Sequence, residues 1–316
     1  MVQWLLLTTT VNRLIQGNAY SVLKDLPDGI VQTCVTSPPY FGLRDYGVKG
    51  QIGLEETPDD YIQRLLLVFR EVRRVLRDDG TLWLNLGDSY AGSGKGGQSD
   101  EKRSTNWQPE YGNKGARYGL KPKDLIGIPW RVAFALQADG WYLRQDIIWH
   151  KPNPMPESVT DRCTKAHEYI FLLSKSERYY FDNEAIQEPA QNWGTRDRDG
   201  KAESGLTGLT PHRGLNYSGD RETRNKRSVW TVATKPYKGA HFATFPPDLI
   251  TPCILAGAPV GYTVLDPFVG SGTTAAVAKS LGRRYIGIEL NREYLTLAEE
   301  RLANTLPPQP TLMEVA

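Results

Sequence analysis

An apolar run, Gly29-Ile30-Val31-Gln32-Thr33-Cys34-Val35, leads directly into Thr36-Ser37-Pro38-Pro39-Tyr40-Phe41. A proline has no N–H to donate to a strand ladder, and it restricts the conformation of the residue before it. The junction therefore predicts a buried strand that ends in a loop at the two prolines. Open α/β sheets bind ligands at the carboxyl ends of their strands, so this loop is a candidate ligand site.

The chemistry of this loop suits a flat ligand that carries an amino group. The two prolines fix the backbone, so the hydroxyl of Ser37 and the carbonyl of Pro38 form a rigid pair of acceptors beside the ring of Tyr40. The acceptors would hold the two N–H bonds of an exocyclic amino group, and the tyrosine would stack on its ring. A turn with a cis proline and a core tyrosine is the alternative interpretation.

A second candidate site lies in residues 263–274, Thr-Val-Leu-Asp-Pro-Phe-Val-Gly-Ser-Gly-Thr-Thr. The pattern predicts a short strand, a turn that contains Gly270 and Gly272, and a helix that begins near Thr273. Glycines let a backbone approach a ligand closely, and the first helical N–H groups supply donors. The next apolar run ends at Glu289, 19 positions after Gly270. In nucleoside-binding folds a carboxylate at this spacing binds the ribose hydroxyls.

Together these motifs resemble the amino-methyltransferases of DNA, which transfer a methyl group from S-adenosylmethionine to an exocyclic nitrogen of cytosine or adenine. The catalytic motif of that family, (D/N/S)-P-P-(Y/F/W), matches residues 37–40, and its cofactor motif, F-x-G-x-G, matches residues 268–272. Residues 241–250 are similar to the segment that lines the methionine end of the cofactor. The order of the motifs, catalytic before cofactor, is that of the beta class, and the resemblance extends over most of residues 12–305.

The resemblance implies a doubly wound, Rossmann-like α/β methyltransferase sheet with permuted motif order and a basic target-recognition insertion. It implies S-adenosylmethionine as cofactor, double-stranded DNA as partner, and direct methyl transfer to a flipped base without a metal or a covalent intermediate. A homodimer is a further expectation from the family. The implied catalytic residues are Ser37, Pro38, Pro39 and Tyr40. The implied cofactor-binding residues are Asn18, Phe245, Pro246, Asp266, Phe268, Gly270, Gly272, Thr273 and Glu289.

The chain divides into a catalytic half (12–186), a target-recognition region (187–240), a cofactor-binding half (241–305) and a disordered tail (306–316). Hydrophobic periodicity predicts helices at 19–26, 59–76, 125–138 and 292–303. It predicts strands at 13–16, 80–88 and 141–149, and a pair at 168–174 and 179–182. Asp88, at the end of one of these strands, is interpreted either as a residue of the base pocket or as a loop cap.

The chain has 316 residues, 40% of them hydrophobic, and a net charge of +2, which allows one large α/β core with a smaller lobe. A nearly neutral protein must bind nucleic acid through local patches. Two stretches, the glycine-rich loop 91–124 and the region 187–240, contain more basic than acidic residues. A solvated loop, a disordered linker and, for Arg44, a salt bridge are the alternatives. The predicted DNA-binding residues are Arg44, Lys95, Arg213, Arg221, Arg224 and Arg227.

The three cysteines and four histidines lack metal-ligand spacing, which predicts a reduced intracellular protein without a zinc site. The first seven residues lack both a basic region and sufficient apolar length for a signal peptide or membrane span, so we expect a cytoplasmic protein.

Several reactions remain open at this point. Ser37 preceded by Thr36 favours cytosine N4 over adenine N6, because serine at this motif position is commoner among N4 enzymes of the family. A covalent cytosine-C5 methylase would need a cysteine nucleophile, and Cys253 after Pro252 is the candidate; a buried core cysteine is the alternative. A methyltransferase of RNA or of a protein amide, and a DNA-binding relic without turnover, are further hypotheses.

Overall fold

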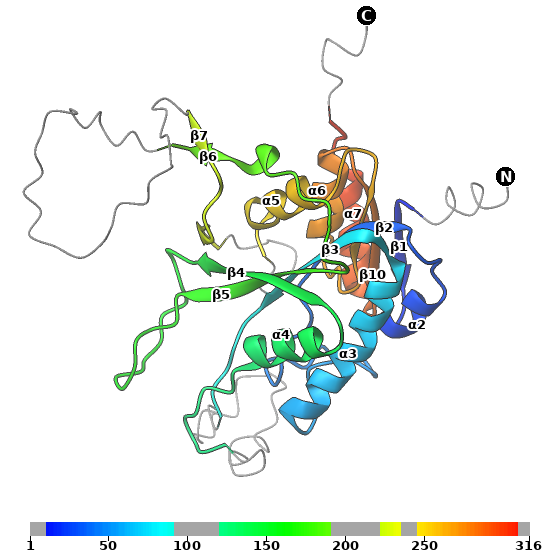
Figure 1. The fold of residues 1–316 in the computed structure, drawn as a ribbon. Helices are drawn as coiled ribbons and strands as arrows, with labels where there is room; N and C mark the ends of the chain where they lie inside the picture. Colours follow the sequence, from blue (N-terminus) through cyan, green and yellow to red (C-terminus); the bar gives the residue numbers. More distant parts are fainter. Residues whose placement is uncertain (1–10, 92–119, 191–221, 235–244, 309–316) are drawn as a thin grey trace, which may run out of the picture.

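The computed structural model describes residues 11–91, 120–190, 222–234 and 245–308, and its centre is an eight-stranded sheet (Figure 1). In sheet order the strands are β1 (Arg13–Gln16), β10 (Arg284–Glu289), β9 (Thr263–Asp266), β2 (Val31–Thr36), β3 (Leu76–Leu86), β5 (His167–Ser174), β4 (Tyr142–His150) and β8 (Val229–Thr231). The first five strands pair in parallel, and β5 is antiparallel to both β3 and β4. This arrangement confirms the predicted doubly wound α/β sheet.

Helices cover both faces of the sheet (Figure 1). One face packs against α2 (Ala19–Lys24), α3 (Pro58–Val75) and α4 (Ile128–Ala138), and the other against α5 (Pro247–Gly257), α6 (Thr273–Ser280) and α7 (Arg292–Ala303). All six residues of β2 are buried, and successive side chains enter opposite cores, as Cys34 and Val35 do. A strand covered on both sides is hydrophobic without alternation, which explains the continuous apolar run.

Short polar signals set where the helices begin. The Thr57 side chain accepts a hydrogen bond from the Asp60 amide at 3.1 Å and caps α3, and Asn291 caps α7 through the Glu293 amide. The Asp88 carboxylate accepts from the amides of Gly127 and Ile128 at 3.0 and 3.1 Å. Asp88 therefore binds the first amides of α4, as a cap does, and its place in the base pocket stays a prediction.

One predicted strand is wrong. Residues 179–182 form no strand; Phe181 instead stacks on Trp83 with ring centroids 6.1 Å apart, and the hairpin partner of β5 is β4. The predicted region 187–240 also contributes a strand to the main sheet, because β8 pairs with β4. Outside the sheet are a 3-10 turn (Glu184–Ile186) and the short pair β6 (Glu188–Pro189) and β7 (Thr223–Arg224).

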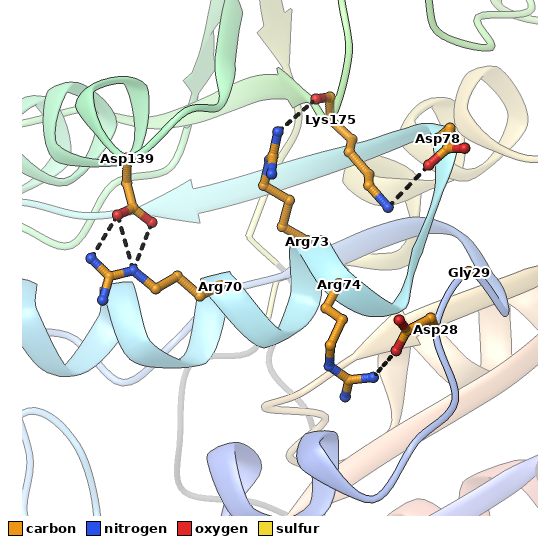
Figure 2. A pocket seen from close by; sticks show the side chains of 8 residues that line it. All are labelled: Asp28, Gly29, Arg70, Arg73, Arg74, Asp78, Asp139 and Lys175. Carbon is orange, nitrogen blue, oxygen red and sulfur yellow. Dashed lines mark hydrogen bonds and ion pairs between the residues drawn. The ribbon is translucent and has the colours of Figure 1, made fainter.

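A charged groove lies beside α3, at the end of the sheet opposite the carboxyl end of β2 (Figure 2). Its charges are paired across the groove: Arg70 binds Asp139 at 2.6 Å, and Arg74 forms an ion pair with Asp28. Lys175 binds Asp78 at 3.3 Å. The two arginine pairs join α3 to the end of α4 and to the loop before β2.

Candidate active site

The permuted chain brings its two motif-bearing loops together because β2 and β9 are neighbours in the sheet. Thr33 lies opposite Val264 and Cys34 opposite Leu265 in parallel register, so both strands end at the same edge. At that edge the Thr36 hydroxyl donates to Asp266 Oδ1 at 2.6 Å. A direct hydrogen bond therefore connects the start of one loop to the start of the other, across 230 positions of sequence.

Asp266 connects the loop after β2 to the loop after β9. Its side chain is buried, and it also accepts from the Thr274 hydroxyl at 2.6 Å and from the Phe268 amide at 3.0 Å. Burial raises the pKa of Asp266 to about 6, although these three donors oppose the shift. Both carboxylate oxygens are thus used within the protein, and the predicted contact of Asp266 with a cofactor stays a prediction.

The loop after β2 holds its two prolines in trans, since the described residues contain no cis peptide bond. The Tyr61 hydroxyl, from α3, donates to the carbonyl of Pro39 at 2.8 Å. The carbonyl of Pro38, by contrast, has no hydrogen-bond partner within the described part of the chain. Ser37 Oγ donates to the Tyr40 hydroxyl at 3.3 Å and keeps its capacity to accept, and the predicted role of Ser37 and Pro38 as an acceptor pair stays a prediction.

The ring of Tyr40 is fixed on one side by the backbone that follows β3. A Cβ added at Gly87 would lie 2.6 Å from Cε2 of Tyr40, so only glycine leaves room for the ring. The hydroxyl of Tyr40 donates to Glu168 Oε2 at 2.7 Å and lies 3.2 Å from Asn85 Oδ1. The ring therefore has a fixed plane, which is what stacking on a flat ligand requires.

Glu168, Lys151 and Asn85 are functional candidates that the sequence analysis missed. Glu168 forms an ion pair with Lys151, and Asn85 Nδ2 donates to the carbonyl of Tyr169 at 3.0 Å. The signals were weak: Lys151 precedes a proline-containing turn, and Glu168 stands near the start of an apolar strand. Only the register of β3, β4 and β5 brings them to Tyr40.

Glu289 lies at the carboxyl end of β10, where it contacts the loop that contains Gly270. Its carboxylate accepts from the amides of Gly270 and Asn291 at 3.0 and 2.7 Å, and burial raises its pKa. The Gly17 amide donates to the Glu289 carbonyl at 2.9 Å, which brings Asn18 near the same edge. The Asn18 side chain caps α2 through the Ser21 amide at 3.3 Å, and its contact with a cofactor stays a prediction.

The glycine loop fits S-adenosylmethionine. Gly272 has φ +84°, and a Cβ there would lie 2.8 Å from Cβ of Ala298, so glycine is needed for α6 to pack on α7. The hydroxyl of Ser271 is buried and has no hydrogen-bond partner among the described residues. With the Glu289 carboxylate and the first amides of α6, this loop offers acceptors for ribose hydroxyls and donors for a carboxylate.

The remaining predicted cofactor residues flank these groups. Thr273 begins α6 and accepts a hydrogen bond from Arg301, and Phe268 is partly buried against the core. Phe245 and Pro246 immediately precede α5, where Phe245 packs on the second core cluster. Residues 241–244 of the same motif lie outside the described residues.

The predicted DNA-binding residues are only partly within the described chain. Arg44 lies close to Tyr46 and Tyr294, beside the cofactor half. Arg224 and Arg227 both bind Glu188, at 3.0 and 2.6 Å. Lys95, Arg213 and Arg221 lie outside the described residues. For all six, contact with DNA stays a prediction.

The cysteine alternative receives no support from the geometry. Cys253 is buried in the core on α5, where its Sγ lies 3.8 Å from the Leu249 carbonyl, and burial raises the pKa of the thiol. A buried thiol of raised pKa is a poor nucleophile. Within the described ranges, no three His, Cys, Asp or Glu side chains are grouped to hold a metal ion. Nor does that part of the chain contain a helix of the length and apolarity that crossing a bilayer takes.

Comparison with known sequences gives long matches. Residues 31–300 match the N6/N4 methyltransferase family described as DNA methylase. The chain is 50% identical over 293 residues to the Type II methyltransferase M.XycI of Xanthomonas campestris pv. cyanopsidis. This alignment covers 92% of this chain and 87% of that protein. It is equally similar, over the same shares of both chains, to the Type II methyltransferase M.Cfr9I of Citrobacter freundii.

Solved structures agree with this match. A putative DNA modification methylase of Thermus thermophilus, TTHA0409, complexed with S-adenosyl-L-methionine, aligns over 94% of this chain and 95% of its own, with a TM-score of 0.58 and 26% identity. The cytosine-N4-specific PvuII DNA methyltransferase aligns over 96% and 89%, with a TM-score of 0.64. At 19% identity, the PvuII enzyme supports the fold alone.

Proposed function

We propose that this chain, which belongs to the DNA methylase family and is an S-adenosylmethionine-dependent DNA methyltransferase, methylates the N4 amino group of a flipped cytosine. The observation that carries the proposal is the hydrogen bond from Thr36 to Asp266, at 2.6 Å. It holds Ser37, the next residue, beside the glycine loop. An acceptor at one loop and a methyl donor at the other are thereby kept in reacting range.

In this proposal Ser37 and Pro38 hold the amino group. The hydroxyl oxygen of Ser37 and the carbonyl oxygen of Pro38 accept its two N–H bonds, which turns the nitrogen lone pair away from both oxygens. Positive charge grows on that nitrogen as it attacks, and fixed acceptors stabilise the charge. The engagement of the Pro39 carbonyl by Tyr61 supports this assignment, because it leaves the Pro38 carbonyl as the available one.

Tyr40 stacks on the base in the proposed complex. Its ring is backed by Gly87 and held at the hydroxyl by Glu168, so the plane is set before the base arrives. A base within a duplex is stacked and its amino group is paired, so the nucleotide must rotate out of the helix. That rotation costs a few kcal/mol, roughly the energy that stacking on an aromatic side chain returns.

The glycine loop and Glu289 are proposed to bind the cofactor. When bound, S-adenosylmethionine supplies a methyl group on a sulfonium, which is electrophilic enough for a neutral amine to attack. Glu289 accepts hydrogen bonds from the ribose hydroxyls through the lone pairs that Gly270 and Asn291 leave unused. The amide of Thr273 and the hydroxyl of Ser271 are the donors proposed for its carboxylate, since the Gly272 amide already donates to the Val269 carbonyl at 2.8 Å.

Cytosine is proposed over adenine from the residue at the start of the catalytic motif. Ser37 is a neutral acceptor, and serine preceded by Thr36 resembles the N4 members of the family. Arginines of the region 187–240 are proposed to contact DNA phosphates or guanine edges, since the sequence of this region has more basic than acidic residues. Assembly into a homodimer likewise stays a prediction.

The test is methyl transfer from labelled S-adenosylmethionine to unmethylated genomic DNA, followed by mass spectrometry of the nucleosides. We expect N4-methylcytosine from the wild-type chain and none from Ser37→Ala. Ser176→Ala, which removes a hydroxyl bonded to the Asp78 carbonyl at the far end of the sheet, is the matched control and should act like the wild type. N6-methyladenine as the product would overturn the choice of base, and transfer to RNA alone would overturn the choice of DNA.

A further inference from the structure

A line of hydrogen bonds connects the side chains of Ser37, Tyr40 and Glu168, from the catalytic loop into the sheet. The roles proposed above use only Ser37 and the ring of Tyr40. Ser37 Oγ donates to the Tyr40 hydroxyl at 3.3 Å, and that hydroxyl donates to Glu168 Oε2 at 2.7 Å. Lys151 pairs with Oε1 of the same glutamate. Neither the acceptor pair nor the stacking of a base requires a carboxylate at the end of this line.

Glu168 is held in one position by its surroundings. Its side chain is 16% exposed and that of Lys151 19%. The amide of Asn85 donates to Glu168 Oε2 at 3.3 Å and to the Tyr169 carbonyl at 3.0 Å, so Asn85 is itself fixed by the backbone of β5. A partly buried carboxylate is stabilised by such partners. Lys151 also lies over the ring of Trp149, 4.3 Å from its centroid.

The hydrogen bonds of this line point in one direction. Burial, and after it the charge of Glu168, raises the pKa of Tyr40 well above its usual value, so the phenol stays protonated and donates. Ser37 donates toward Tyr40, and Tyr40 donates toward Glu168. Each oxygen between the loop and the carboxylate therefore accepts on one side and donates on the other, which is the arrangement that proton relay needs.

We infer that Ser37, Tyr40 and Glu168 form a relay that carries the proton of the methylated amino group to the Glu168 carboxylate. The inference rests on the proposed function. As nitrogen bonds to the methyl carbon and the methyl–sulfur bond breaks, one N–H bond also breaks and its electron pair stays on nitrogen. Ser37 Oγ takes this proton while its own passes to Tyr40, and the proton of Tyr40 passes to Glu168 Oε2. One proton moves in total, and the carboxyl group later releases it to water.

Glu168 acts in this scheme as a positioning residue, because it reaches the amino group only through Tyr40 and Ser37. A cationic amino group on an aromatic ring is a stronger acid than a carboxylic acid, so the transfer runs downhill. The charge of Glu168 also polarises both hydroxyls, which makes the Ser37 oxygen a better acceptor while positive charge grows on the nitrogen. Lys151 balances the charge of the carboxylate in the resting protein.

The experiment compares Glu168→Gln with Glu71→Gln in single-turnover methyl transfer to DNA. In Glu168→Gln the amide oxygen still accepts from Tyr40 but cannot take its proton, whereas Glu71 pairs with Arg74 on α3, remote from the loop. We expect Glu168→Gln to slow transfer about tenfold to a hundredfold, with the Kd for DNA changed by no more than about twofold. The wild-type rate should fall in D2O, because relay protons move as the new bond forms, and Glu168→Gln should lose most of this D2O effect, a response that a purely structural role would not produce.

Tyr40→Phe is the second variant, because it keeps the stacking ring and the Glu168–Lys151 pair but removes the hydroxyl between them. We expect it to lose as much rate as Glu168→Gln, and the double variant to lose no more than either. Wild-type rates in both single variants, or losses that multiply in the double variant, would overturn the relay. If the wild-type chain transfers no methyl group to DNA, the proposed function fails instead, so the two failures are distinguishable.

Discussion

Replacing Asp266 by Asn isolates the energetic effect of the buried charge that joins the two loops. The ionised carboxylate accepts from Thr36, Thr274 and the Phe268 amide, and burial raises its pKa to about 6. Asn has nearly the same size, and a threonine hydroxyl is able to rotate and accept from its NH2 group. The Thr274 hydroxyl already lies 3.3 Å from the Val35 carbonyl, a second acceptor for its proton. The exchange therefore chiefly removes the charge.

The sign of the pH dependence follows from the direction of the pKa shift. An unfolded Asp has a pKa of about 3.9, so the folded chain binds this proton more tightly than the unfolded one. The charge therefore lowers the free energy of unfolding by about 3 kcal/mol well above the folded pKa, and this cost disappears as the pH falls toward about 4. Between pH 7 and pH 5, the wild-type chain should gain about 1.3 kcal/mol relative to Asp266→Asn.

The assay is urea unfolding of both proteins at pH 7, 6 and 5, followed by tryptophan fluorescence. All other titrating groups are shared, so the difference between the two free energies reports Asp266 alone. Thr36→Val removes one hydrogen-bond donor to the ionised Asp266, so it should raise the pKa of Asp266 and shift the increase in unfolding free energy to higher pH. Thr36→Ser keeps the donor and serves as the matched control. A difference that stays constant with pH, or one that moves further toward the Asn variant between pH 7 and pH 5, would refute the reasoning.

Three further substitutions test the geometry of the site. Gly87→Ala places a Cβ 2.6 Å from Cε2 of Tyr40, so we expect a loss of about 1 to 3 kcal/mol in urea unfolding and slower incorporation of labelled methyl groups. Wild-type behaviour in both assays would show that the ring is not fixed there. Gly272→Ala places a Cβ only 2.8 Å from that of Ala298, at a residue whose φ of +84° is unfavourable for alanine. It should lower the free energy of unfolding, measured by heat or urea, by about 1 to 3 kcal/mol. An unchanged free energy of unfolding would contradict the close packing of α6 on α7. Glu289→Gln keeps the shape of the side chain but removes its charge, and calorimetry should show the Kd for S-adenosylmethionine raised about tenfold, because hydrogen bonds to a charged group are the stronger ones. An equal Kd would remove Glu289 from the cofactor site.

The sequence was sufficient to predict the architecture where local signals and burial agree. The run that became β2 is apolar at nearly every position because both of its faces are covered, and the prolines mark its end. The helix at 292–303 was predicted from its amphipathic pattern, and the structure begins α7 at Arg292, after the Asn291 cap. The two loops were identified from their motifs, and their contact through Thr36 and Asp266 agrees with the permuted order.

Tertiary contacts account for what the sequence did not reveal. Residues 179–181 are aromatic and 179–182 were predicted as a strand, but Phe181 packs against the second core cluster and stacks on Trp83, and these residues form no strand. Glu168 and Lys151 carry no local signal of their role. Glu168 is 128 positions from its partner Tyr40, and only the register of three strands makes the contact predictable.

The place of β2 between β3 and β9 has a consequence for biosynthesis. As the chain leaves the ribosome, β2 and β3 emerge early, whereas β9 follows only after the greater part of the protein has been made. Until then β2 presents an unpaired, largely apolar edge, the kind of surface that chaperones shield and that nucleates aggregation. A chain that ends before β9 therefore leaves this edge of β2 without its partner strand.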